Sequence, residues 1–437
     1  MKSVRKQVVE IIDRFYNTTL DLKTIQNNYF KQNVTESSER KRIVVLSKDI
    51  LRWKGRIDYF INIALSSPFS NLQSRLLAIL ELATFELIYD EKVPNYAAIN
   101  SAVDLSKIIF NKKTSGLVNA VLRKISRSSV IAKPDQIKDF EWYSFPEWLY
   151  NKWVKQFGES RTQQLCEYHN SPVALTIRRN IINIDHKIFI EKIEDEDIEI
   201  LQVKNSTNFY NVKSGGMQLL KHQLFVDGNI SFQDRGAGAI VEVLDPQPNE
   251  IILDVCCAPG TKTNYISELM RNTGVVYASD FDRDRLEIAK NEDIRLKNTN
   301  IFWEQKDAKN DMFPMADRIL VDAPCTGTGV IGRRPDIKWR RKPKHLSKIV
   351  ELQKSILVHI CKFVKDGGIL VYATCSLEDE ENWQVVEAFL KLHNDFKVTS
   401  IGNTQLENLI DEKGALKTFP SVHKIDGMFA VKMIRER

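Results

Sequence analysis

Strand-like and helix-like segments alternate over the C-terminal part of the chain, and this alternation constrains the fold more than any other feature of the sequence. The strand candidates are residues 251–255, 275–280, 318–322 and 368–374. Such alternation is typical of a parallel sheet with helices on its faces. We therefore predict a doubly wound α/β domain with a mostly parallel sheet over residues 236–437.

The first strand candidate leads into a turn of small residues that is followed by a helix-like segment. The turn reads Cys256, Cys257, Ala258, Pro259, Gly260, Thr261, Lys262. Small side chains let a ligand approach the backbone, and a helix N-terminus favours a carboxylate or phosphate. One glycine in place of the G-x-G-x-x-G pattern favours adenosylmethionine over a dinucleotide. An ordinary βα turn, with Lys262 as a solvated residue, is the alternative for this segment taken alone.

Two aspartates are candidates for binding the rest of such a cofactor. Asp280 lies 20 residues after Gly260 and ends the second strand candidate, where a carboxylate can accept ribose hydroxyls. Asp307 stands where a third strand would end and could accept a hydrogen bond from the adenine amino group. Taken alone, a loop aspartate such as Asp307 is more often just a turn residue.

Two of the six cysteines, Cys325 and Cys375, follow strand candidates. Strand ends of a parallel sheet meet at the edge where ligands bind, so both thiols are expected beside the cofactor turn. Cys166 and Cys361 neighbour apolar residues and are predicted to be small core residues. A single cysteine is usually just buried, but two at adjacent strand ends favour catalysis.

Methylation of cytosine at carbon 5 is a reaction that requires such a pair of groups. A thiolate that adds at carbon 6 turns the ring into an enamine and thereby activates carbon 5. The thiol must ionise, and an acid near ring nitrogen 3, for which Asp322 is the candidate, stabilises the adduct. A base must then remove the carbon-5 proton. These residue types alone leave open which cysteine attacks.

A basic segment follows Cys325. Seven of the twelve residues 333–344 are basic and one is acidic, whereas the whole chain carries a net charge of only +6. Such a segment can neutralise phosphates and stack a base, although a solvated charged loop is the alternative. The predicted RNA contacts are Arg333, Arg334, Lys338, Trp339, Arg340 and Arg341.

The N-terminal part is predicted to be helical. Only two of the 18 glycines fall in the first 150 residues, and apolar residues recur at helical spacing over 99–109 and 118–125. Residues 126–135 have the composition of a linker. We predict an all-helical domain over 1–130, linking helices and a small α+β subdomain over 140–235, and the α/β domain over 236–437.

The sequence gives little support for membrane insertion, secretion or metal binding. Apolar runs are short and interrupted by charges, and the first residues have the pattern of an amphipathic helix. The seven histidines are scattered and no C-x-x-C occurs. We expect a cytoplasmic protein with neither a membrane partner nor a metal.

Four motifs together carry a resemblance to a known family: Asp254–Thr263, Asp280–Leu286, Asp322–Trp339 and Tyr372–Asn382. In these the chain resembles the bacterial 16S ribosomal RNA cytosine-5 methyltransferase B family (RsmB, also called Sun or Fmu). The N-terminal part is similar to the antitermination factor NusB, at Val93-Pro94, Ala98-Ile99-Asn100 and Leu122-Arg123-Lys124 among other positions.

The resemblance implies a Rossmann-like methyltransferase domain and an RNA-binding helical domain. It further implies adenosylmethionine bound by residues 256–262, Asp280, Asp307 and Asp322, with Cys375 as nucleophile and Cys325 assisting proton removal and product release. The implied substrate is 16S ribosomal RNA, free or in an early small-subunit particle, and we expect a monomer. Cys257 and Thr261 depart from the family's usual alanine and glycine, which leaves cofactor affinity open.

Two other functions fit the sequence. A noncatalytic RNA-binding or assembly factor would use the helical domain and keep the second domain only as a platform, although the intact cysteine pair argues against it. An enzyme that acts on transfer RNA or on another ribosomal cytosine would carry the same motifs.

Overall fold

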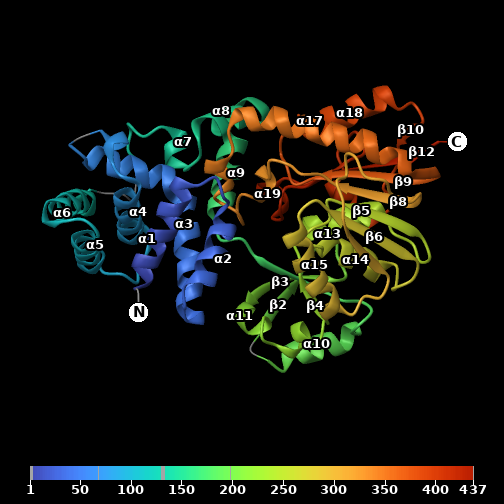
Figure 1. Ribbon diagram of the computed structural model, residues 1–437, viewed down its shortest axis with the longest axis horizontal. Coiled ribbons are helices and arrows are strands. Elements are labelled where there is room, and N and C mark those ends of the chain that lie inside the picture. Colours follow the sequence, from blue (N-terminus) through green and yellow to red (C-terminus); the bar gives the residue numbers. More distant parts are fainter. Residues whose placement is uncertain (1–2, 67, 129–132, 197, 437) are drawn as a thin grey trace. The chain divides into compact units, whose positions relative to one another are not determined.

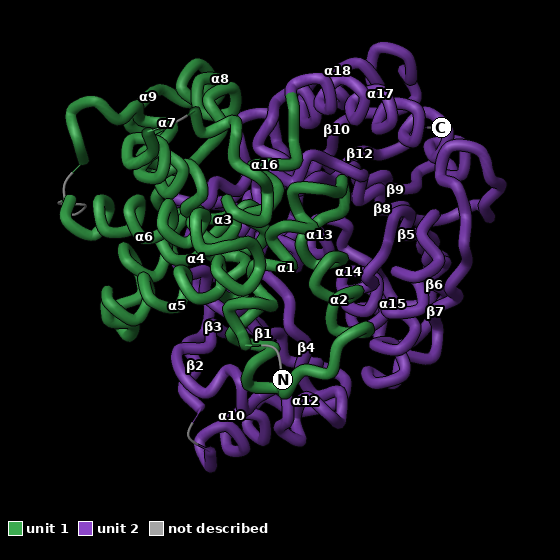
Figure 2. Tube along the Cα trace, turned by 60° about the vertical axis from the view of Figure 1, so that its left-hand side comes forward, with its two compact units in different colours: residues 1–171, 331–342 green, residues 172–330, 343–437 purple. Residues whose placement is uncertain are grey.

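The computed structural model describes residues 3–66, 68–128, 133–196 and 198–436. The chain forms two compact units, residues 1–171 with 331–342 and residues 172–330 with 343–437 (Figure 2). The segment 140–235, predicted as one linking part, is therefore divided between the two units after Ser171, and residues 331–342 belong to the first unit. Residues 129–132 of the predicted linker lie outside the described residues.

The first unit is helical, as the scarcity of glycine predicted. Side-chain caps mark helix starts, as where the side-chain Oδ1 of Asn111 accepts from the Thr114 backbone N–H at 3.0 Å. Val118, Leu122 and Ile125 lie on one face of that helix and are buried in the core of the unit. The helices are α1 (Val4–Asn17), α2 (Leu22–Gln32), α3 (Ser37–Ala64), α4 (Ser74–Tyr89), α5 (Asn95–Ile109), α6 (Lys112–Arg127), α7 (Asp139–Trp142), α8 (Glu147–Phe157), α9 (Glu159–Asn170) and α16 (Ile337–Arg340).

The second unit begins with a small α+β part, as predicted. Its four strands form an antiparallel sheet in the order β2-β3-β1-β4 within the described residues. Ile177, Phe189 and Tyr210 lie in its core. The elements are β1 (Leu175–Arg179), α10 (His186–Glu194), β2 (Glu199–Gln202), β3 (Phe209–Ser214), α11 (Gly216–Leu219), α12 (Gln223–Val226) and β4 (Ile230–Phe232).

The larger sheet of the second unit has the order β10-β12-β9-β8-β5-β6-β7, with β11 paired to β12. The five strands from β9 to β7 are parallel, and β12 pairs antiparallel with β9 and β10. The strands are β5 (Ile251–Val255), β6 (Val275–Asp280), β7 (Ile301–Gln305), β8 (Ala316–Asp322), β9 (Val364–Thr374), β10 (Phe396–Val398), β11 (Leu416–Lys417) and β12 (Phe429–Arg435). The mostly parallel α/β prediction is therefore confirmed.

Helices cover both faces of this sheet (Figure 1). Neighbouring strand residues point to opposite faces, so Leu253 packs with α17 and α18 while Ile252 packs with α13 and α14. All parallel strands run the same way, so the carboxyl ends of β5, β6, β8 and β9 meet at one edge. The helices are α13 (Arg235–Leu244), α14 (Thr261–Leu269), α15 (Arg283–Leu296), α17 (Pro343–Ile360), α18 (Trp383–Leu392) and α19 (Pro420–His423).

Candidate active site

Cys325 and Cys375 lie together at this edge. They follow β8 and β9, which are hydrogen-bonded neighbours, with Asp322 opposite Ala373. The two Sγ atoms are 2.9 Å apart, and the Cys375 backbone N–H donates to Cys325 Sγ at 3.3 Å. Neither cysteine forms a disulfide, and both are half-buried. The sequence-based expectation that the two thiols meet therefore agrees with the geometry.

The electrostatic setting of Cys325 favours its protonated form. The hydrogen bond with Cys375, followed by burial, raises the pKa of Cys325 well above its ordinary value. Cys325 therefore keeps its proton in this arrangement, and either sulfur can be the donor in the contact between the two thiols.

Glu381 joins the two loops that carry the thiols, and this carboxylate was not singled out from the sequence. It is fully buried and accepts from the Thr326 backbone N–H at 2.8 Å, the Ser376 hydroxyl at 2.5 Å and the Gln353 amide at 3.0 Å. Thr326 and Ser376 each follow a cysteine directly. The buried carboxylate thus holds the thiol loops in fixed relative positions.

Lys262 and Asp322 form an ion pair beside the thiols, with Lys262 Nζ 2.6 Å from Asp322 Oδ2. Burial lowers the pKa of Lys262, but the Asp322 carboxylate and the nearby Cys375 raise it, and the net shift is upward. Lys262 therefore stays a cation next to Cys375. The alternative of a solvated first-turn lysine does not describe this side chain, which is largely buried.

The turn after β5 has the compact form expected of a cofactor loop. Gly260 has φ +89°, and a Cβ there would lie 2.8 Å from both Ala289 Cβ and Trp303 Cη2. Asp280 accepts from the Ala258 backbone N–H at 3.0 Å and is buried at the end of β6. The loop, the helix N-terminus and the acid thus adjoin one another, as the sequence predicted.

Asp254, at the end of β5, offers a test of whether the loop suits adenosylmethionine. Its Oδ2 accepts from the Thr263 hydroxyl at 2.6 Å, while its buried Oδ1 has no hydrogen-bond partner among the described residues. Burial raises the pKa of Asp254 to about 7. An unsatisfied carboxylate oxygen at this loop suits the ammonium of a methionine moiety, so the residues present fit that cofactor.

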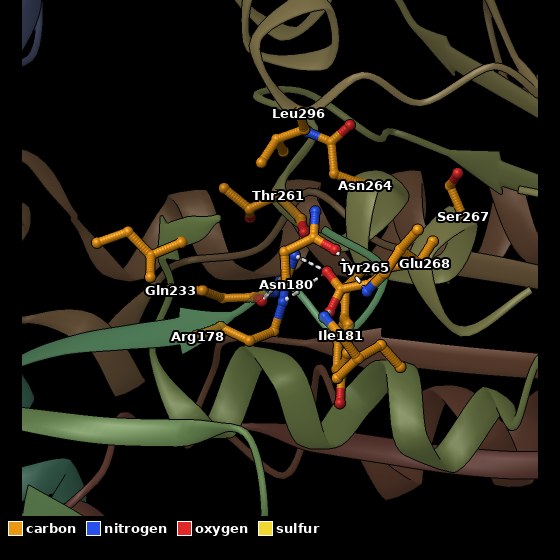
Figure 3. Close-up of polar contacts among 12 residues, drawn as sticks. Arg178, Asn180, Ile181, Gln233, Thr261, Asn264, Tyr265, Ser267, Glu268 and Leu296 are labelled. Atoms are coloured by element: carbon orange, nitrogen blue, oxygen red, sulfur yellow. Dashed lines mark hydrogen bonds and ion pairs between the residues drawn. The ribbon is translucent and has the colours of Figure 1, made fainter. Parts of the chain in front are cut away.

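A buried ion pair supports the helix that follows this loop (Figure 3). Arg178 of β1 and Glu268 of α14 are each about 1% exposed, and Nη2 lies 2.9 Å from Oε2. Arg178 also donates to Gln233, whose amide donates to the Thr261 carbonyl at 3.3 Å. This chain of contacts fixes both ends of α14 to the small α+β part.

Asp307 follows β7, as predicted, but its carboxylate is engaged locally. One oxygen accepts from the Lys309 backbone N–H at 3.0 Å and the other from the Asn310 amide at 2.7 Å. Each carboxylate oxygen has a second lone pair, so contact with an adenine amino group remains a prediction.

The basic segment differs most from its expected role. Lys338 is fully buried in the first unit, and its Nζ donates to the Arg52 carbonyl at 3.1 Å, the Ser144 carbonyl at 3.1 Å and the Asn170 side chain at 2.6 Å. Burial lowers the pKa of Lys338 well below its ordinary value. A lysine with three internal acceptors is a structural contact, so Lys338 is not presented to RNA in this structure.

Trp339 and Arg340 also point into the helical unit. The Trp339 indole donates to the Leu51 carbonyl at 2.6 Å. Arg340 donates to the Thr18 and Phe15 carbonyls at 2.7 Å each, and its guanidinium lies over the Phe15 ring. These contacts hold residues 331–342 on the first unit. RNA contact by Arg333, Arg334 and Arg341 remains a prediction, and Arg334 is exposed.

The other cysteines show no sign of activation. Burial raises the pKa of Cys256 and Cys257 in the cofactor loop, and likewise that of Cys166 and Cys361. A buried thiol with a raised pKa is a poor nucleophile. Within the described ranges, we find no group of three or more His, Cys, Asp or Glu side chains that could hold a metal, and no helix with the length and apolarity needed to cross a membrane.

Models of three known families match this chain. Residues 241–434 match the 16S rRNA methyltransferase RsmB/F family, residues 2–127 the NusB family, and residues 145–209 the RsmF/B-like ferredoxin-like domain. The resemblances drawn from the sequence motifs are thereby confirmed.

Individual relatives match over nearly the whole chain. A Bacillus subtilis protein named "Probable ribosomal RNA small subunit methyltransferase B" is 32% identical over 99% of this chain and 98% of its own length. The ribosomal RNA small subunit methyltransferase B of Yersinia pseudotuberculosis is 29% identical over 99% and 97%. The solved structure of PH0851 superposes with a TM-score of 0.81 at 25% identity, covering 100% of this chain and 99% of that one.

The fold and the loop after β5 define an adenosylmethionine-dependent methyltransferase with a helical N-terminal domain. The near-complete match to ribosomal RNA small subunit methyltransferase B proteins shows that the chain belongs to that family, whose members methylate ribosomal RNA.

Proposed function

We propose that this enzyme methylates carbon 5 of one cytosine in 16S ribosomal RNA, with Cys375 as nucleophile and Cys325 assisting proton removal and product release. The observation that carries the proposal is the thiol pair, 2.9 Å apart at adjacent strand ends beside the cofactor loop. Cysteine-assisted methylation needs two such groups, whereas direct methylation of a nucleophilic atom needs none.

The first step is addition of the Cys375 thiolate to carbon 6 of the ring. The Lys262 cation lies beside Cys375 and can balance the negative charge of the attacking sulfur. Cys325 keeps its proton at this stage, because its pKa is raised. A protonated Cys325 is not the attacking group, in line with the division of roles that the family resemblance implied.

We assign Asp322 as the acid at ring nitrogen 3, which would pass a proton to the ring as Cys375 adds and take it back as Cys375 leaves. Its partner Lys262 keeps the carboxylate oriented and balances its charge while the proton is on the ring. Bound adenosylmethionine supplies the electrophilic methyl group, and residues 256–262, Asp280, Asp307 and Asp322 are the proposed contacts.

Removal of the carbon-5 proton and cleavage of the carbon–sulfur bond end the reaction. Cys325 can act as this base only after its own proton has passed to solvent, and its raised pKa then makes the ionised sulfur a strong base. The carbon-5 proton goes to Cys325, its bonding electrons form the carbon 5–carbon 6 double bond, and Cys375 leaves as the thiolate. The enzyme then regains the Cys375 thiolate. We place this activity in the cytoplasm, on free RNA or an early small-subunit particle, with the enzyme as a monomer.

Transfer of a labelled methyl group to unmodified 16S ribosomal RNA tests the activity. We expect incorporation together with release of the carbon-5 hydrogen as tritium from [5-³H]cytosine RNA. Bisulfite mapping of RNA from a deletion strain would then identify the target. Failure to methylate any RNA cytosine would overturn the proposal, and a target in transfer RNA would correct its substrate.

Single cysteine variants test the roles. Cys325→Ala should accumulate a covalent protein–RNA adduct, because release is blocked, whereas Cys375→Ala should form no adduct and no product. Cys361→Ala is the matched control, because that thiol is buried just before the start of β9, the opposite end of this strand from Cys375. It should form product at the wild-type rate and accumulate no adduct. Adduct accumulation by Cys375→Ala instead would reverse the assignment.

A further inference from the structure

A second polar site lies in the second unit, at a pocket of about 460 Å³. Its walls come from the β2–β3 turn, the start of α13, the short helix over Thr404–Leu409, and α19 with the residues that follow it. This volume lies in the range of small-ligand sites, about 300–1,000 Å³. None of the residues proposed above for catalysis or cofactor binding lines it.

The pocket is basic and rich in amides. Lys204, Arg235, His423 and Lys424 line it, together with five Asn or Gln side chains, and none of its lining residues is an aspartate or glutamate. We call it the basic pocket. Cationic groups with amide donors suit an anion that has further hydrogen-bonding groups around it.

Arg235 is held rigidly in the wall of the basic pocket, and one of its guanidinium nitrogens is available to donate to a ligand. The side chain is 3% exposed, and its Nη2 donates to Glu242 at 2.8 Å while the guanidinium lies 5.2 Å from the Phe209 ring centroid. Its buried Nη1 has no hydrogen-bond partner among the described residues. Glu242 offsets the charge of Arg235, and the exposed Lys204 adds a positive charge to the rim of the pocket.

The wall of the basic pocket is connected to the Cys375 strand end. The segment that carries His423 and Lys424 continues to Gly427, whose N–H donates to the Gly329 carbonyl at 2.9 Å. Gly329 in turn donates to the Cys375 carbonyl at 3.0 Å. A Cβ on Gly329 would lie 2.0 Å from the Gly427 oxygen, so these backbones are in close contact. A ligand in the pocket is therefore held in a fixed position relative to the nucleophile.

We propose that the basic pocket binds one phosphodiester of the RNA substrate with its adjoining base, and so holds a nucleotide near the target cytosine. The proposal rests on the function proposed above. Lysine and arginine would contact the phosphate, and the amides would read the edge of the base by hydrogen bonds. No Phe, Tyr or Trp lines the pocket, so the proposed base contacts are mainly hydrogen bonds, with the His423 imidazole as the one ring available for stacking.

Two exposed positions allow a test that spares the fold. Lys204→Glu reverses a charge at the phosphate, Asn408→Ala removes an amide, and Lys213→Glu makes the same charge reversal on β3 outside the pocket. For each variant, affinity for an unmodified 16S ribosomal RNA transcript is measured over a range of salt concentrations. The Kd for adenosylmethionine reports whether the catalytic domain is intact.

Lys204→Glu should weaken RNA binding about tenfold and lower the slope of log K against log salt by about one. Asn408→Ala should weaken binding without changing the slope, because no charge is lost. Both should raise the KM for RNA and leave kcat and the adenosylmethionine Kd unchanged, and Lys213→Glu should match the wild type. The proposal would be overturned if both pocket variants bound RNA as tightly as the wild type. It would also be overturned if Lys213→Glu lost as much RNA affinity as Lys204→Glu.

A free nucleotide is the other source of a phosphate with a base. If adenosine monophosphate bound the wild type, and Lys204→Glu lost that binding while it kept wild-type RNA affinity, the assignment to RNA would be wrong. Methyl transfer by the wild type is measured in parallel. Its absence would refute the proposed function, whereas the RNA affinities would still decide the pocket.

Discussion

Removal of Glu268 gives the sharpest structural prediction, because this carboxylate and Arg178 form a buried pair across two parts of the second unit. Both side chains are about 1% exposed, with Nη2 and Oε2 2.9 Å apart (Figure 3). Loss of one partner from a buried pair costs about 3–5 kcal/mol, since the other charge stays buried without compensation. Glu268→Gln keeps the side-chain volume, so we expect the lower end of this range.

The effect should be localised to the helix that follows the cofactor loop. Glu268 also accepts from the Ile181 backbone N–H at 2.9 Å, and Arg178 reaches Thr261 through Gln233. The amides of α14 should therefore exchange with deuterium about 100-fold faster in Glu268→Gln, which corresponds to about 3 kcal/mol. The affinity for adenosylmethionine should fall as well, because the loop before α14 loses its support.

Two further variants control this measurement. Glu191→Gln breaks the exposed pair with Lys187, 4.0 Å apart, and should leave exchange unchanged. The double variant Arg178→Met with Glu268→Leu removes both charges and should recover much of the lost protection. Wild-type protection of α14 in Glu268→Gln would refute the reasoning, as would a double variant worse than the single one.

Three other predictions concern the site itself. Gly260→Ala should lower adenosylmethionine affinity and thermal stability, because the new Cβ meets Ala289 and Trp303 at a φ of +89°. Calorimetric titration measures the affinity, and a melting curve measures the stability. Glu381→Ala should lower kcat up to about 100-fold with adenosylmethionine Kd unchanged, because the thiol loops lose their shared acceptor. Asp254→Asn should flatten the dependence of stability on pH. Because the pKa of Asp254 is raised from 3.8 to about 7 by folding, the wild type loses stability as the pH rises from 3.8 to about 7. If the melting temperatures of the wild type and Asp254→Asn changed by the same amount over that pH range, this prediction would be wrong.

Much of the fold could be predicted from the sequence because its signals are local. The alternation of strand and helix patterns predicted β5 and β6 with their observed ends, and the lack of early glycine predicted the helical unit. The position of Cys325 and Cys375 after strands then sufficed to place both thiols at one edge, since parallel strands end together.

The basic segment shows where such local reasoning fails. A run of Arg and Lys has the same pattern whether its side chains meet phosphates or carbonyl oxygens. The acceptors of Lys338 lie 168 to 286 residues away in the sequence, so no nearby pattern could indicate them. Glu381 was missed for the same reason, because its partner Thr326 lies 55 residues earlier in the chain.

The sequence by itself determined the class of fold, the cofactor loop and the presence of two thiols at strand ends. The tertiary structure alone decided their 2.9 Å separation, the raised pKa of Cys325 and the pairing of Lys262 with Asp322. The reason is physical: strand and helix propensities act between residues close in sequence, whereas hydrogen bonds and pKa shifts depend on distances between groups that only folding brings together.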